Sequence, residues 1–513
     1  MSNMFLEETF NFEKIIILDV ANNHFGDVKH GLNLINEFSK LNYPKGYTTY
    51  FKLQYRNLDT FIHPDSPKES HYIKRFNSTK LNKEQLSSLA ANIKELDNEK
   101  FKLMITPFDE DSVRWASDSE ADIIKIASCS ANDWPLLEEA SALNKPIVAS
   151  TGGLDIESID NLVSFLRHRA VNFSLMHCIS VYPTKPENCN LSFIDTLKKR
   201  YPKISIGWST HEPPFDTNLV IAAISKGANL LERHICLPKE DKPQNAYSST
   251  THELQSWLDK IELTNQILGE SHLKNREEEI NSINSLSRGV YAKKFIKKGE
   301  FINKKDIYFA FPLIKKGQHT SSSIKFPSEA LLDINKNESL IESKNIKSPK
   351  KNPNLYLKSA IHEIKALLSL GNIHLNSTFK LELSHHKGPE NFKKIGTTII
   401  NCINREYCKK ILVQLPQQFH PLHYHPKKEE TFQILYGKLE IISDGHKYSL
   451  NEGETLTVLP GVWHCFYSEK GCIFEEISTT HFNEDSVYKE KSIQLLNRKQ
   501  RKTTVDHWGR FQM

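Results

Sequence analysis

The sequence predicts a large (β/α)8 barrel of the TIM-barrel architecture, followed by two smaller β-rich parts. Between residues 14 and 270, short apolar runs of strand length alternate with segments of helical periodicity. Eight such units in about 250 residues have the size and rhythm of a TIM barrel. An open doubly wound sheet is the alternative, but such a sheet usually has fewer units. After residue 285 the alternation ends, and short strand-like runs with turn residues take over.

The predicted barrel strands are short and apolar, and helical segments separate them. The strands are Ile15–Val20, Thr49–Leu53, Leu103–Ile105, Ile123–Ala127, Ile147–Ala149, Phe173–His177, Ile204–Trp208 and Asn229–Ile235. The helices are Val28–Phe38, Lys83–Leu96, Asp111–Ala116, Leu136–Leu143, Ile156–Arg167, Leu191–Arg200, Asn218–Lys226 and Leu254–Leu268. In Ile156–Arg167 the apolar side chains share one helical face, as a helix that packs on a barrel requires.

Changes in composition predict the domain boundaries. We expect the barrel over residues 1–270, a compact β-rich module over 284–347, a linker over 348–354 and a third domain over 355–513. The linker Ser348–Asn354 contains two prolines and two lysines but no large apolar side chain. Such a composition is typical of an exposed connection between domains.

The third domain begins with an amphipathic segment, Leu355–Leu370, and continues from Phe379 as short strands and turns. Several short strands at close spacing favour a small barrel or a double-sheet sandwich. We interpret the basic end of the chain, Asn497–Met513, as a surface tail.

Composition and charge indicate folded domains and exclude several classes of protein. Hydrophobic residues make up 38% of the chain and aromatic residues 10%, which supports packed cores. The 67 basic and 62 acidic residues leave a net charge of +5 without a basic stripe, which argues against nucleic acid as a partner. No apolar run approaches the length of a membrane span, and Met1–Lys14 lacks the apolar core of a signal peptide. The eight cysteines form no C-x-x-C pair. We therefore expect a cytoplasmic protein that binds neither nucleic acid nor membrane.

Two histidines follow neighbouring predicted strands. His211 comes after Ile204–Trp208, and His234 ends the next strand. Active sites of β/α barrels lie at the C-terminal ends of the strands, and neutral imidazole is the commonest protein ligand of metals. A single histidine there could be a satisfied polar group. Two of them, flanked by Ser209 and Glu232, favour a divalent metal with positions open for substrate.

Two lysines and several hydroxyl groups are predicted at the same end of the barrel. Lys52 shares a strand face with Gln54, and Lys125 lies in the fourth strand. A lysine inside a barrel is costly unless an anion pairs with it. Serine and threonine at strand-to-helix turns can donate to phosphate oxygens, although singly they more often cap helices. The hydroxyl candidates are Thr106, Ser128, Ser150, Ser180, Tyr182 and Ser209. Together they predict a pocket for a small phosphorylated acid beside a divalent metal.

The ordered motifs at these strand ends resemble those of the sialic acid (N-acetylneuraminate) synthase family. They are KLQ, TPFD, KIAS, STGG, HCISVYPT, GWSTH and ERHI. The later stretch SRGVYAKKFIKKGE resembles the antifreeze-like (SAF) module that follows the barrel in these enzymes. The match covers about Ile15–Lys347. The family condenses phosphoenolpyruvate with an N-acylated hexosamine, forms a nonulosonic acid and releases phosphate.

The resemblance implies a role for each candidate residue. His211 and His234 would bind a divalent metal, typically manganese, that polarises the acceptor aldehyde. The catalytic candidates are Asp19, Lys125, His211 and His234. The candidates for phosphoenolpyruvate binding are Lys52, Thr106, Lys125, Ser128, Ser150 and Ser209. Gln54 and Tyr182 would face the acceptor, an amino-hexose. The resemblance also implies a homodimer in which the antifreeze-like module of one chain caps the barrel of the other.

Four positions depart from the pattern of this family. Asp19 stands where the family has a glutamate, Ser180 where it has an asparagine, and Asn245 where it has an acid. Phe311 stands where an arginine usually precedes Pro312. The metal and phosphoenolpyruvate side is therefore nearly complete, whereas the acceptor side is altered. We expect a different acceptor sugar or reduced activity, unless residues elsewhere compensate.

The third domain carries a second predicted metal site. His423, His425 and Glu430 have the spacing of the first cupin motif, and His464 lies in the second. Strand alternation places His423 and His425 on one face. Three histidines and one carboxylate suit Mn, Fe, Ni or Zn, and Glu429 is a competing ligand. The domain resembles sugar-isomerase-like cupins fused to some nonulosonate synthases, which leaves isomerisation, epimerisation or simple binding of a sugar open.

Three functions therefore compete. The first is a two-site enzyme, a synthase barrel joined to a metal-binding cupin. The second is an aldolase-like enzyme that uses phosphoenolpyruvate and a sugar without the N-acyl group. The third is a sugar-binding or regulatory protein whose altered barrel does not catalyse.

Overall fold

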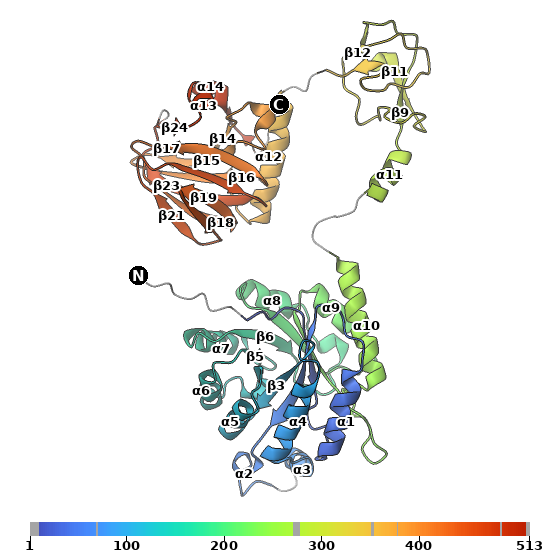
Figure 1. Ribbon diagram of the computed structural model, residues 1–513, viewed down its shortest axis with the longest axis vertical. Helices are drawn as coiled ribbons and strands as arrows, with labels where there is room; N and C mark the ends of the chain where they lie inside the picture. The colour runs from blue at the N-terminus through green and yellow to red at the C-terminus, as the bar shows by residue number, and fades with distance from the viewer. Residues whose placement is uncertain are drawn as a thin grey trace. The chain divides into compact units, whose positions relative to one another are not determined.

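The computed structural model describes residues 10–67, 70–269, 277–349, 353–376, 378–482 and 485–508. The chain divides into two compact units, Met1–Lys274 and Asn275–Met513 (Figure 1). The first unit contains the alternating strands and helices, and the second contains the β-rich parts.

The first unit is a closed barrel of eight parallel strands that pair in sequence order, with the last strand pairing with the first. The strands are β1 (Ile15–Asp19), β2 (Thr48–Tyr55), β3 (Phe101–Pro107), β4 (Ile123–Ile126), β5 (Ile147–Ser150), β6 (Phe173–Cys178), β7 (Ile206–Thr210) and β8 (Leu230–His234). In this register Asp19 lies opposite Lys52 on one side and His234 on the other. The predicted barrel is confirmed.

Helices lie outside the strands of the barrel (Figure 1). They are α1 (Val28–Ser39), α4 (Lys83–Glu95), α5 (Glu110–Asp118), α6 (Trp134–Ala142), α7 (Ile156–His168), α8 (Phe193–Arg200), α9 (Asn218–Ser225) and α10 (Thr251–Leu268), with the short helices α2 (Leu58–Phe61) and α3 (His71–Ser78) after β2. In α7 the Asp155 side chain caps the first turn by accepting from the backbone N–H of Ser158 at 2.8 Å. None of the helices within the described ranges has the length and apolar character that crossing a bilayer requires.

The inside of the barrel changes from apolar to polar along each strand. At the N-terminal ends, Ile17, Tyr50, Ile123 and Leu230 pack in a buried apolar cluster. Two residues further along the same strands, and therefore on the same faces, come Asp19, Lys52, Lys125 and Glu232. Outside the strands, a second and larger apolar cluster joins the barrel to its helices. Apolar packing thus holds the barrel, and these four buried charged groups gather toward the C-terminal ends of the strands.

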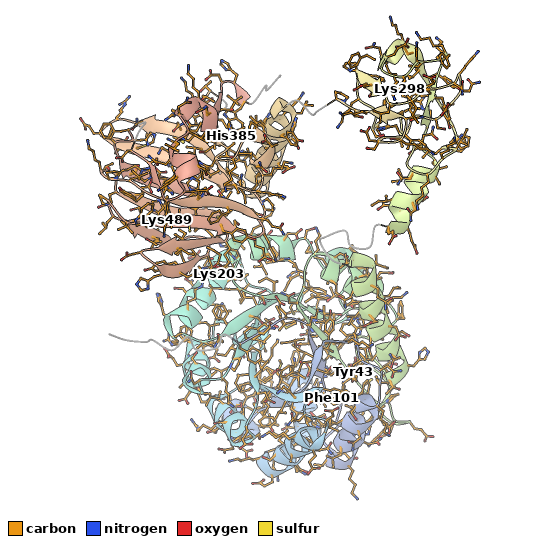
Figure 2. The ribbon with its side chains drawn as sticks, turned by 45° about the horizontal axis from the view of Figure 1, so that its top comes forward. Tyr43, Phe101, Lys203, Lys298, His385 and Lys489 are labelled. Atoms are coloured by element: carbon orange, nitrogen blue, oxygen red, sulfur yellow. The ribbon has the colours of Figure 1, made fainter. Side chains whose placement is uncertain are left out.

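Aromatic packing helps to fix the N-terminal end of the barrel. Tyr43, in the connection before β2, packs edge to face against Phe101 at the start of β3, with ring centroids 5.2 Å apart (Figure 2). The Tyr43 hydroxyl donates to the carbonyl oxygen of Phe38 at 2.7 Å. Buried aromatic pairs of this geometry stabilise beyond the area that they bury.

The second unit begins with a small β-rich part. Its elements are α11 (Glu277–Ser285), β9 (Gly289–Ala292), β10 (Phe301–Ile302), β11 (Ile307–Ala310), β12 (Ser328–Ala330) and β13 (Ile346–Lys347). Strands β10, β12 and β13 form one small sheet, and β9 and β11 form another. An apolar cluster that includes Val290, Ile302, Ile334 and Ile346 is their core.

The last part of the chain is a two-sheet sandwich preceded by helix α12 (Pro353–Leu370). Its strands are β14 (Lys380–Ser384), β15 (Thr397–Asn404), β16 (Tyr407–Gln414), β17 (Gln418–Tyr424), β18 (Glu430–Gly437), β19 (Leu439–Ser443), β20 (His446–Leu450), β21 (Thr455–Val458), β22 (His464–Ser468), β23 (Cys472–Thr479), β24 (Val487–Tyr488) and β25 (Lys502–Val505). One sheet has the order β21-β18-β23-β16-β15-β14-β25 and the other β20-β19-β22-β17-β24. Helix α12 packs Leu357, Ile361 and Ile364 into an apolar cluster with β14, β15 and β16.

The interpretation of Asn497–Met513 as a surface tail is wrong for the residues that the structure describes there. Helix α14 (Arg498–Arg501) leads into β25, which pairs with β14. Trp508 is only 5% exposed, and its Nε1 donates to the carbonyl oxygen of Phe379 at 2.9 Å. Two basic residues of this segment, Arg498 and Lys502, both pair with Glu382, which is distant in sequence.

Candidate functional site

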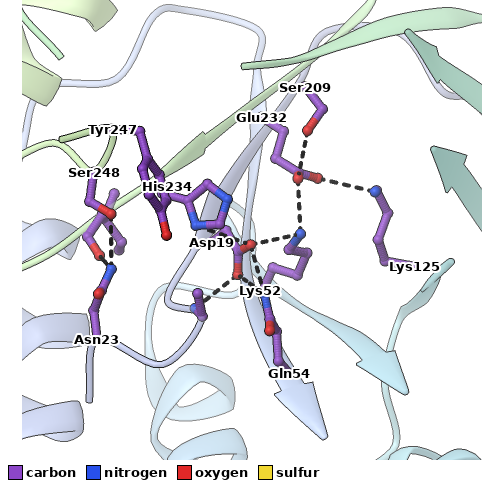
Figure 3. A network of polar contacts seen from close by, with 12 residues as sticks. Asp19, Asn23, Lys52, Gln54, Lys125, Ser209, Glu232, His234, Tyr247 and Ser248 are labelled. Carbon is purple, nitrogen blue, oxygen red and sulfur yellow. Dashed lines mark hydrogen bonds and ion pairs between the residues drawn. The ribbon is translucent and has the colours of Figure 1, made fainter. Parts of the chain in front are cut away.

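A buried carboxylate joins the predicted cationic groups at the C-terminal end of the barrel. Glu232 Oε1 accepts from Ser209 Oγ and from Lys52 Nζ, each at 2.9 Å. Its Oε2 lies 3.5 Å from Lys125 Nζ, and Lys125 donates to Ser150 Oγ at 2.5 Å. Figure 3 shows the two lysines converging on this carboxylate from β2 and β4. Four of the residues predicted to bind phosphoenolpyruvate therefore meet around Glu232.

Asp19 forms the other side of this network. Its Oδ2 lies 3.0 Å from Lys52 Nζ and accepts from Gln54 Nε2 at 3.1 Å. Its Oδ1 accepts from the backbone N–H of Ala21 at 2.9 Å. His234 Nδ1 lies 3.4 Å from Oδ2. Asp19 therefore links Lys52, which is predicted to bind phosphoenolpyruvate, to the predicted acceptor residue Gln54 and to a predicted metal ligand (Figure 3).

The charges in this network explain the directions in which the pKa values of its residues are shifted. Burial alone would raise the pKa of Glu232, but the nearby Lys125 and Lys52 outweigh burial and hold that pKa well below its usual range. Burial likewise opposes ionisation of Asp19, yet Lys52 keeps its pKa lowered. For Lys52 the two carboxylates outweigh burial and raise the pKa. For Lys125 burial wins and lowers the pKa, because Glu232 is its one close carboxylate within the described chain. Lys125 is the less compensated cation, and an anionic ligand would complete its pairing.

The two predicted metal ligands lie beside each other. The ring centroids of His211 and His234 are 5.3 Å apart. His211 Nδ1 lies 2.9 Å from the carbonyl oxygen of Ile179, so Nδ1 donates there and Nε2 is the candidate ligand atom. Burial opposes the charge on this ring, but the Cys178 thiol beside it raises the pKa of His211. His234 Nδ1 is buried and has no hydrogen-bond partner in the part of the chain that the structure describes. Burial lowers the pKa of His234 to about 4, which keeps the ring neutral. The neutral His234 ring, whose Nδ1 is unpartnered within the described chain, lies beside His211, and the pair fits a divalent metal that keeps positions open for substrate.

Aromatic rings cover the two histidines. The ring of Tyr182 lies 4.2 Å from that of His211, and Tyr247 lies 5.2 Å from both Tyr182 and His234. Tyr182 is 52% exposed, so it lies at the mouth of the barrel, as an acceptor-facing residue should. Tyr247 was not predicted, because it lies in a loop where strand patterning gives no signal.

Ser128 and Ser180 approach each other across a glycine. The backbone N–H of Gly152 donates to Ser128 Oγ at 3.0 Å. A Cβ atom on Gly152 would lie 2.5 Å from Ser180 Oγ and 2.8 Å from Ser128 Oγ, so a larger residue would displace both hydroxyls. Ser128 Oγ also donates to Cys178 Sγ at 3.7 Å. Thr106 Oγ1 is buried and finds no hydrogen-bond partner among the described residues, which leaves it free for a ligand.

Asn245, which stands where the family has an acid, orders the loop after β8. Its Oδ1 accepts from the backbone N–H groups of Tyr247 at 3.1 Å and Ser248 at 2.8 Å. Its Nδ2 donates to Asn23 Oδ1 at 3.3 Å, and Asn23 in turn donates to the carbonyl oxygen of Ile235 at 2.8 Å. An aspartate could accept the two backbone bonds but could not donate to Asn23. Asn245 therefore fits its local partner and supplies no negative charge.

Arg56 is a further residue that sequence reasoning missed. Its Nη2 donates to Gln54 Oε1 at 3.1 Å, and its guanidinium lies 3.5 Å from the ring centroid of Phe108. Its Nε is buried and without a hydrogen-bond partner within the described chain. Together with His24 and Phe76 it lines a small cavity of about 30 Å³. The sequence offered one indication of Arg56, because it follows the end of β2 directly, two residues after Gln54.

Phe311, the other departure on the acceptor side, lies in the second unit, where its side chain is 61% exposed. It follows β11 directly. The hydroxyl of Tyr291 donates to the carbonyl oxygen of Pro312, the residue after it. The expected contact of this segment with an acceptor stays a prediction.

The second predicted metal site is assembled by the strands of the sandwich. The ring nitrogens of His423, His425 and His464 lie within 4.8 Å of one another, and all three residues are buried. Their Nδ1 atoms lie close to backbone carbonyl oxygens, at 3.0 Å from Pro421, 2.8 Å from Asp485 and 3.1 Å from Val462 respectively. Each Nδ1 therefore donates its proton, which leaves each Nε2 as a ligand atom. This second layer of hydrogen bonds fits a metal site and not merely a cluster of polar groups.

Glu430 completes this set. Its Oε1 lies 3.3 Å from His425 Nε2, and its Oε2 lies 3.2 Å from His464 Nε2. The competing candidate, Glu429, is exposed. Burial lowers the pKa of His425 to about 4 and that of His423 well below its usual value, so both rings are neutral, as metal ligands require. Three imidazoles and one carboxylate fit a divalent transition metal.

Comparison with known families and proteins bears on both sites. The model of the NeuB family matches residues 48–273, and the model of the cupin domain matches residues 411–473. The N-acetylneuraminate-9-phosphate synthase of Drosophila melanogaster is 32% identical over 238 residues, which cover 44% of this chain and 61% of that protein. The N,N'-diacetyllegionaminic acid synthase of Campylobacter jejuni is 28% identical over 305 residues, which cover 56% of this chain and 87% of that protein. The crystal structure of a protein from Chromobacterium violaceum, assigned as spore coat polysaccharide biosynthesis protein E, is 37% identical and covers 65% of this chain and 100% of its own, with a TM-score of 0.61.

Proposed function

Because this chain belongs to the NeuB family and carries a cupin domain, we propose that its barrel is a nonulosonic acid synthase. The reaction would condense phosphoenolpyruvate with an N-acylated hexosamine and release phosphate, which makes the protein a phosphoenolpyruvate-dependent transferase. The observation that carries this proposal is the buried network of Lys52, Glu232 and Lys125 beside the paired His211 and His234. The names of the relatives, which are synthases of an N-acetylneuraminate phosphate and of a legionaminic acid, support the reaction class.

The phosphate and carboxylate of phosphoenolpyruvate would bind where Glu232 now holds the two lysines. Lys52 and Lys125 supply charge, and Ser150 on β5 and Ser209 on β7 supply hydroxyl donors. Charge-assisted hydrogen bonds of this kind are about twice as strong as neutral ones. Ser128 and Thr106 would add contacts, because Thr106 Oγ1 is buried without a hydrogen-bond partner within the described ranges.

His211 and His234 would hold the barrel metal through their ring nitrogens. When bound, a divalent ion such as manganese polarises the aldehyde of the acceptor as a Lewis acid. C3 of phosphoenolpyruvate forms the new bond to the aldehyde carbon, and the aldehyde oxygen becomes a hydroxyl. Water then adds at C2, and the C2–O bond breaks so that phosphate leaves with the bridging oxygen.

The acceptor would lie above this network, at the mouth of the barrel. Gln54, Tyr182 and Ser180 are the side chains that we assign to it, and Asn245 would shape the loop beside it. Asp19 positions both substrates, because it binds Lys52 on the phosphate side and Gln54 on the acceptor side. Its lowered pKa makes it a poor proton acceptor, so its role is to orient these groups near the reacting carbons.

The cupin would hold a second divalent metal through His423, His425, His464 and Glu430. The hydrogen bonds from each Nδ1 to a backbone carbonyl support this assignment. We assign to this domain the binding of a sugar, with isomerisation as its candidate reaction. The small β-rich part over 284–347 would be the antifreeze-like module, and 348–354 the linker before the domain at 355–513. A homodimer would let this module reach the barrel of the partner.

Phosphate release tests the proposed reaction. The full-length protein with Mn²⁺ and phosphoenolpyruvate should release phosphate only when an N-acylated hexosamine is present, and His234→Ala should abolish this release. His252→Ala, at an exposed position in α10, is the matched control and should keep full activity. Release with hexoses that lack the N-acyl group would favour the aldolase-like alternative. Binding of the sugar without any release would favour a sugar-binding protein, which the intact lysine and histidine network argues against.

A further inference from the structure

The interior of the cupin sandwich has an apolar end and a charged end. In β16 and β23, Leu412 lies opposite Phe474, and both belong to the apolar cluster between the sheets. Two residues along the same strands, on the same faces, Lys410 lies opposite Glu476. The next strand, β18, repeats the change, since Ile434 is in the apolar cluster and Glu430 is in the metal set. Sheet packing does not need charged residues there, so the charged end calls for another reason.

Ion pairs fill this charged end. Lys410 Nζ lies 2.7 Å from Glu476 Oε1, and Lys428 Nζ lies 3.1 Å from the same oxygen. Lys428 also pairs with Glu430, which joins the ion pairs to the metal site. These four side chains are each at most 5% exposed. Burying ion pairs costs free energy that apolar residues of similar size would not, so they are weak candidates for a purely stabilising role.

A second group of charges on β14, α14 and β25 borders the same end. Glu382 pairs with Lys502 at 2.6 Å and with Arg498. Lys502 acts electrostatically on His420, whose ring lies 4.5 Å from that of the metal ligand His423. The two groups of charges therefore belong to one interior region.

Apart from the partly exposed Arg498, these charges balance within the described residues. The cations are Lys410, Lys428, Arg501 and Lys502, and the carboxylates are Glu382, Glu430, Glu476 and Asp485. A divalent ion would add two further positive charges. Unbalanced charge in a region with little water is unfavourable, and an anionic ligand would offset it.

Arg501 has the donors for such a ligand. Its Nε and Nη1 atoms are buried and have no hydrogen-bond partner among the residues that the structure describes. Its guanidinium lies 5.0 Å from the ring centroid of Tyr488, and the Tyr488 ring stacks on His423 at 5.4 Å. One ring thus separates the unpaired donors from a metal ligand. The Arg501 side chain as a whole is only partly buried, so this border of the region reaches solvent. A guanidinium with unpaired buried donors is a side chain well suited to bind a carboxylate or phosphate oxygen.

We propose that the cupin binds an anionic sugar, with its carboxylate or phosphate on Arg501 and its hydroxyl groups toward the metal of His423, His425, His464 and Glu430. The proposal rests on the metal-binding role of the cupin proposed above. In the proposed barrel reaction the acceptor hexosamine can be neutral, whereas the nonulosonic acid product carries a carboxylate. The cupin therefore selects molecules of the product's class, the sugar acids, over neutral hexoses.

Calorimetric titration of the full-length protein tests this proposal. The variant His211→Ala/His234→Ala is loaded with Mn²⁺, so that the cupin holds the remaining metal, and it is titrated with gluconate, glucose 6-phosphate and glucose. We expect saturable binding of at least one of the two anions and much weaker binding of glucose. Gluconate and glucose 6-phosphate as separate arms distinguish a carboxylate site from a phosphate site.

Arg501→Gln in the same background should weaken anion binding roughly tenfold or more, because it removes a charged donor. Arg501→Lys keeps the charge but not the guanidinium, so its anion affinity should lie between those of the parent protein and Arg501→Gln. It also serves as the test if Arg501→Gln does not fold. Lys499→Gln, at an exposed position in the same helix, should leave binding unchanged. Anion binding to the lysines of the barrel would persist in all three variants, so only the difference between them counts.

Three results would overturn the proposal. They are glucose binding as tightly as the two anions, unchanged anion affinity in Arg501→Gln, and absence of binding by both anions. The metal content of each sample is measured as well. It shows whether the cupin binds Mn²⁺, so a wrong metal assignment is distinguished from a wrong assignment of the anion site. If Mn²⁺ is absent, the same titrations on the metal-free chain still test the role of Arg501.

Discussion

At the scale of single residues, Glu232 explains how two buried lysines are kept in place without a substrate. It binds Lys52 directly, lies 3.5 Å from Lys125 and is itself held by Ser209. Removing one partner from a buried charge cluster leaves the others uncompensated. The carboxylate thus keeps the pocket ordered at a cost, because an incoming anion must compete with it.

Glu232→Gln tests this account. The amide can still accept from Ser209 but cannot neutralise the lysines, so the barrel should lose about 3–5 kcal/mol of stability. Phosphoenolpyruvate should then stabilise the variant more than it stabilises the wild type, because it replaces the missing negative charge. The stability of the barrel can be followed by amide hydrogen exchange in β1–β4, with and without ligand. Glu157→Gln, exposed in α7, is the control. Equal stabilisation of wild type and Glu232→Gln by the ligand would contradict the account.

His24 should give the barrel a pH-dependent stability. Burial, together with the nearby His30 and Arg56, lowers its pKa to about 4 from the usual 6.5. Because the folded-state pKa lies below the unfolded one, the unfolded chain takes up the proton first. Stability from this group is therefore complete above pH 6.5 and is lost as the pH falls to about 4, by roughly 3 kcal/mol over that window.

The measurement is the free energy of opening of β1–β3 by hydrogen exchange between pH 6.5 and 4, corrected for intrinsic exchange. His24→Asn should flatten the dependence, because its amide oxygen can still accept from the backbone N–H of Gly26 without taking up a proton. His168→Asn, exposed at the end of α7, should not change it. The same slope in His24→Asn and wild type would show that His24 does not titrate in this way.

Residues at strand ends could be predicted from the sequence, whereas residues in loops could not. The period of two places Lys52 and Gln54 on one face, and the barrel topology brings Lys125, Ser209 and His234 to the same end. Tyr247 and Asn23 lie in loops after strands, where no periodicity fixes the direction of a side chain. Their positions depend on hydrogen bonds between segments about 220 residues apart, such as that between Asn245 and Asn23.

At the scale of secondary structure, apolar runs predicted every barrel strand, but the last strand of the sandwich was not predicted. β25 has the sequence KTTV, in which one face is polar because Lys502 points toward Glu382. Its other face carries Val505, which packs in the apolar cluster under α12. The sequence of such a short strand resembles a polar tail, because the carboxylate that pairs with its lysine lies far away in the sequence.

Trp508→Ala tests whether this C-terminal segment belongs to the fold. Trp508 is buried in the cluster of α12, and its Nε1 donates to Phe379. The loss of so large a buried side chain should destabilise the sandwich by about 3–5 kcal/mol. Trp508→Phe should cost less, since it mainly loses the hydrogen bond, worth about 1 kcal/mol. Hydrogen exchange in β14 and β15 reports this, with the exposed Tyr407→Ala as the control. Unchanged exchange in Trp508→Ala would mean that the segment does not support the sandwich.

At the scale of the whole molecule, the departures on the acceptor side predict its specificity. We expect that N-acetylmannosamine is not the preferred acceptor. Phe311 cannot donate to an N-acyl carbonyl, and the side chain of Asn245 is already hydrogen-bonded to Asn23 and to the loop after β8. A carbonyl left without a partner costs about 1–3 kcal/mol, or roughly one to two powers of ten in specificity. A bulkier or differently acylated hexosamine would instead gain apolar contact with Phe311.

Comparison of kcat/KM across acylated hexosamines decides this point. Phe311→Arg should raise the value for N-acetylmannosamine, and Phe309→Arg, two residues earlier in β11, is the control for added charge. If N-acetylmannosamine is already the best acceptor by a wide margin and Phe311→Arg does not improve it, the argument from the missing arginine is wrong.

The fate of the bridging oxygen of phosphoenolpyruvate tests the central claim most directly. Phosphoenolpyruvate labelled with oxygen-18 between C2 and phosphorus is incubated with the full-length protein, Mn²⁺ and the best acceptor, and the phosphate is examined by phosphorus NMR. Condensation at the barrel with cleavage of the C2–O bond predicts that the label appears in the released phosphate, and that His234→Ala releases none. Unlabelled phosphate, with the oxygen-18 retained in the organic product, would show cleavage at phosphorus and would contradict a synthase of this kind.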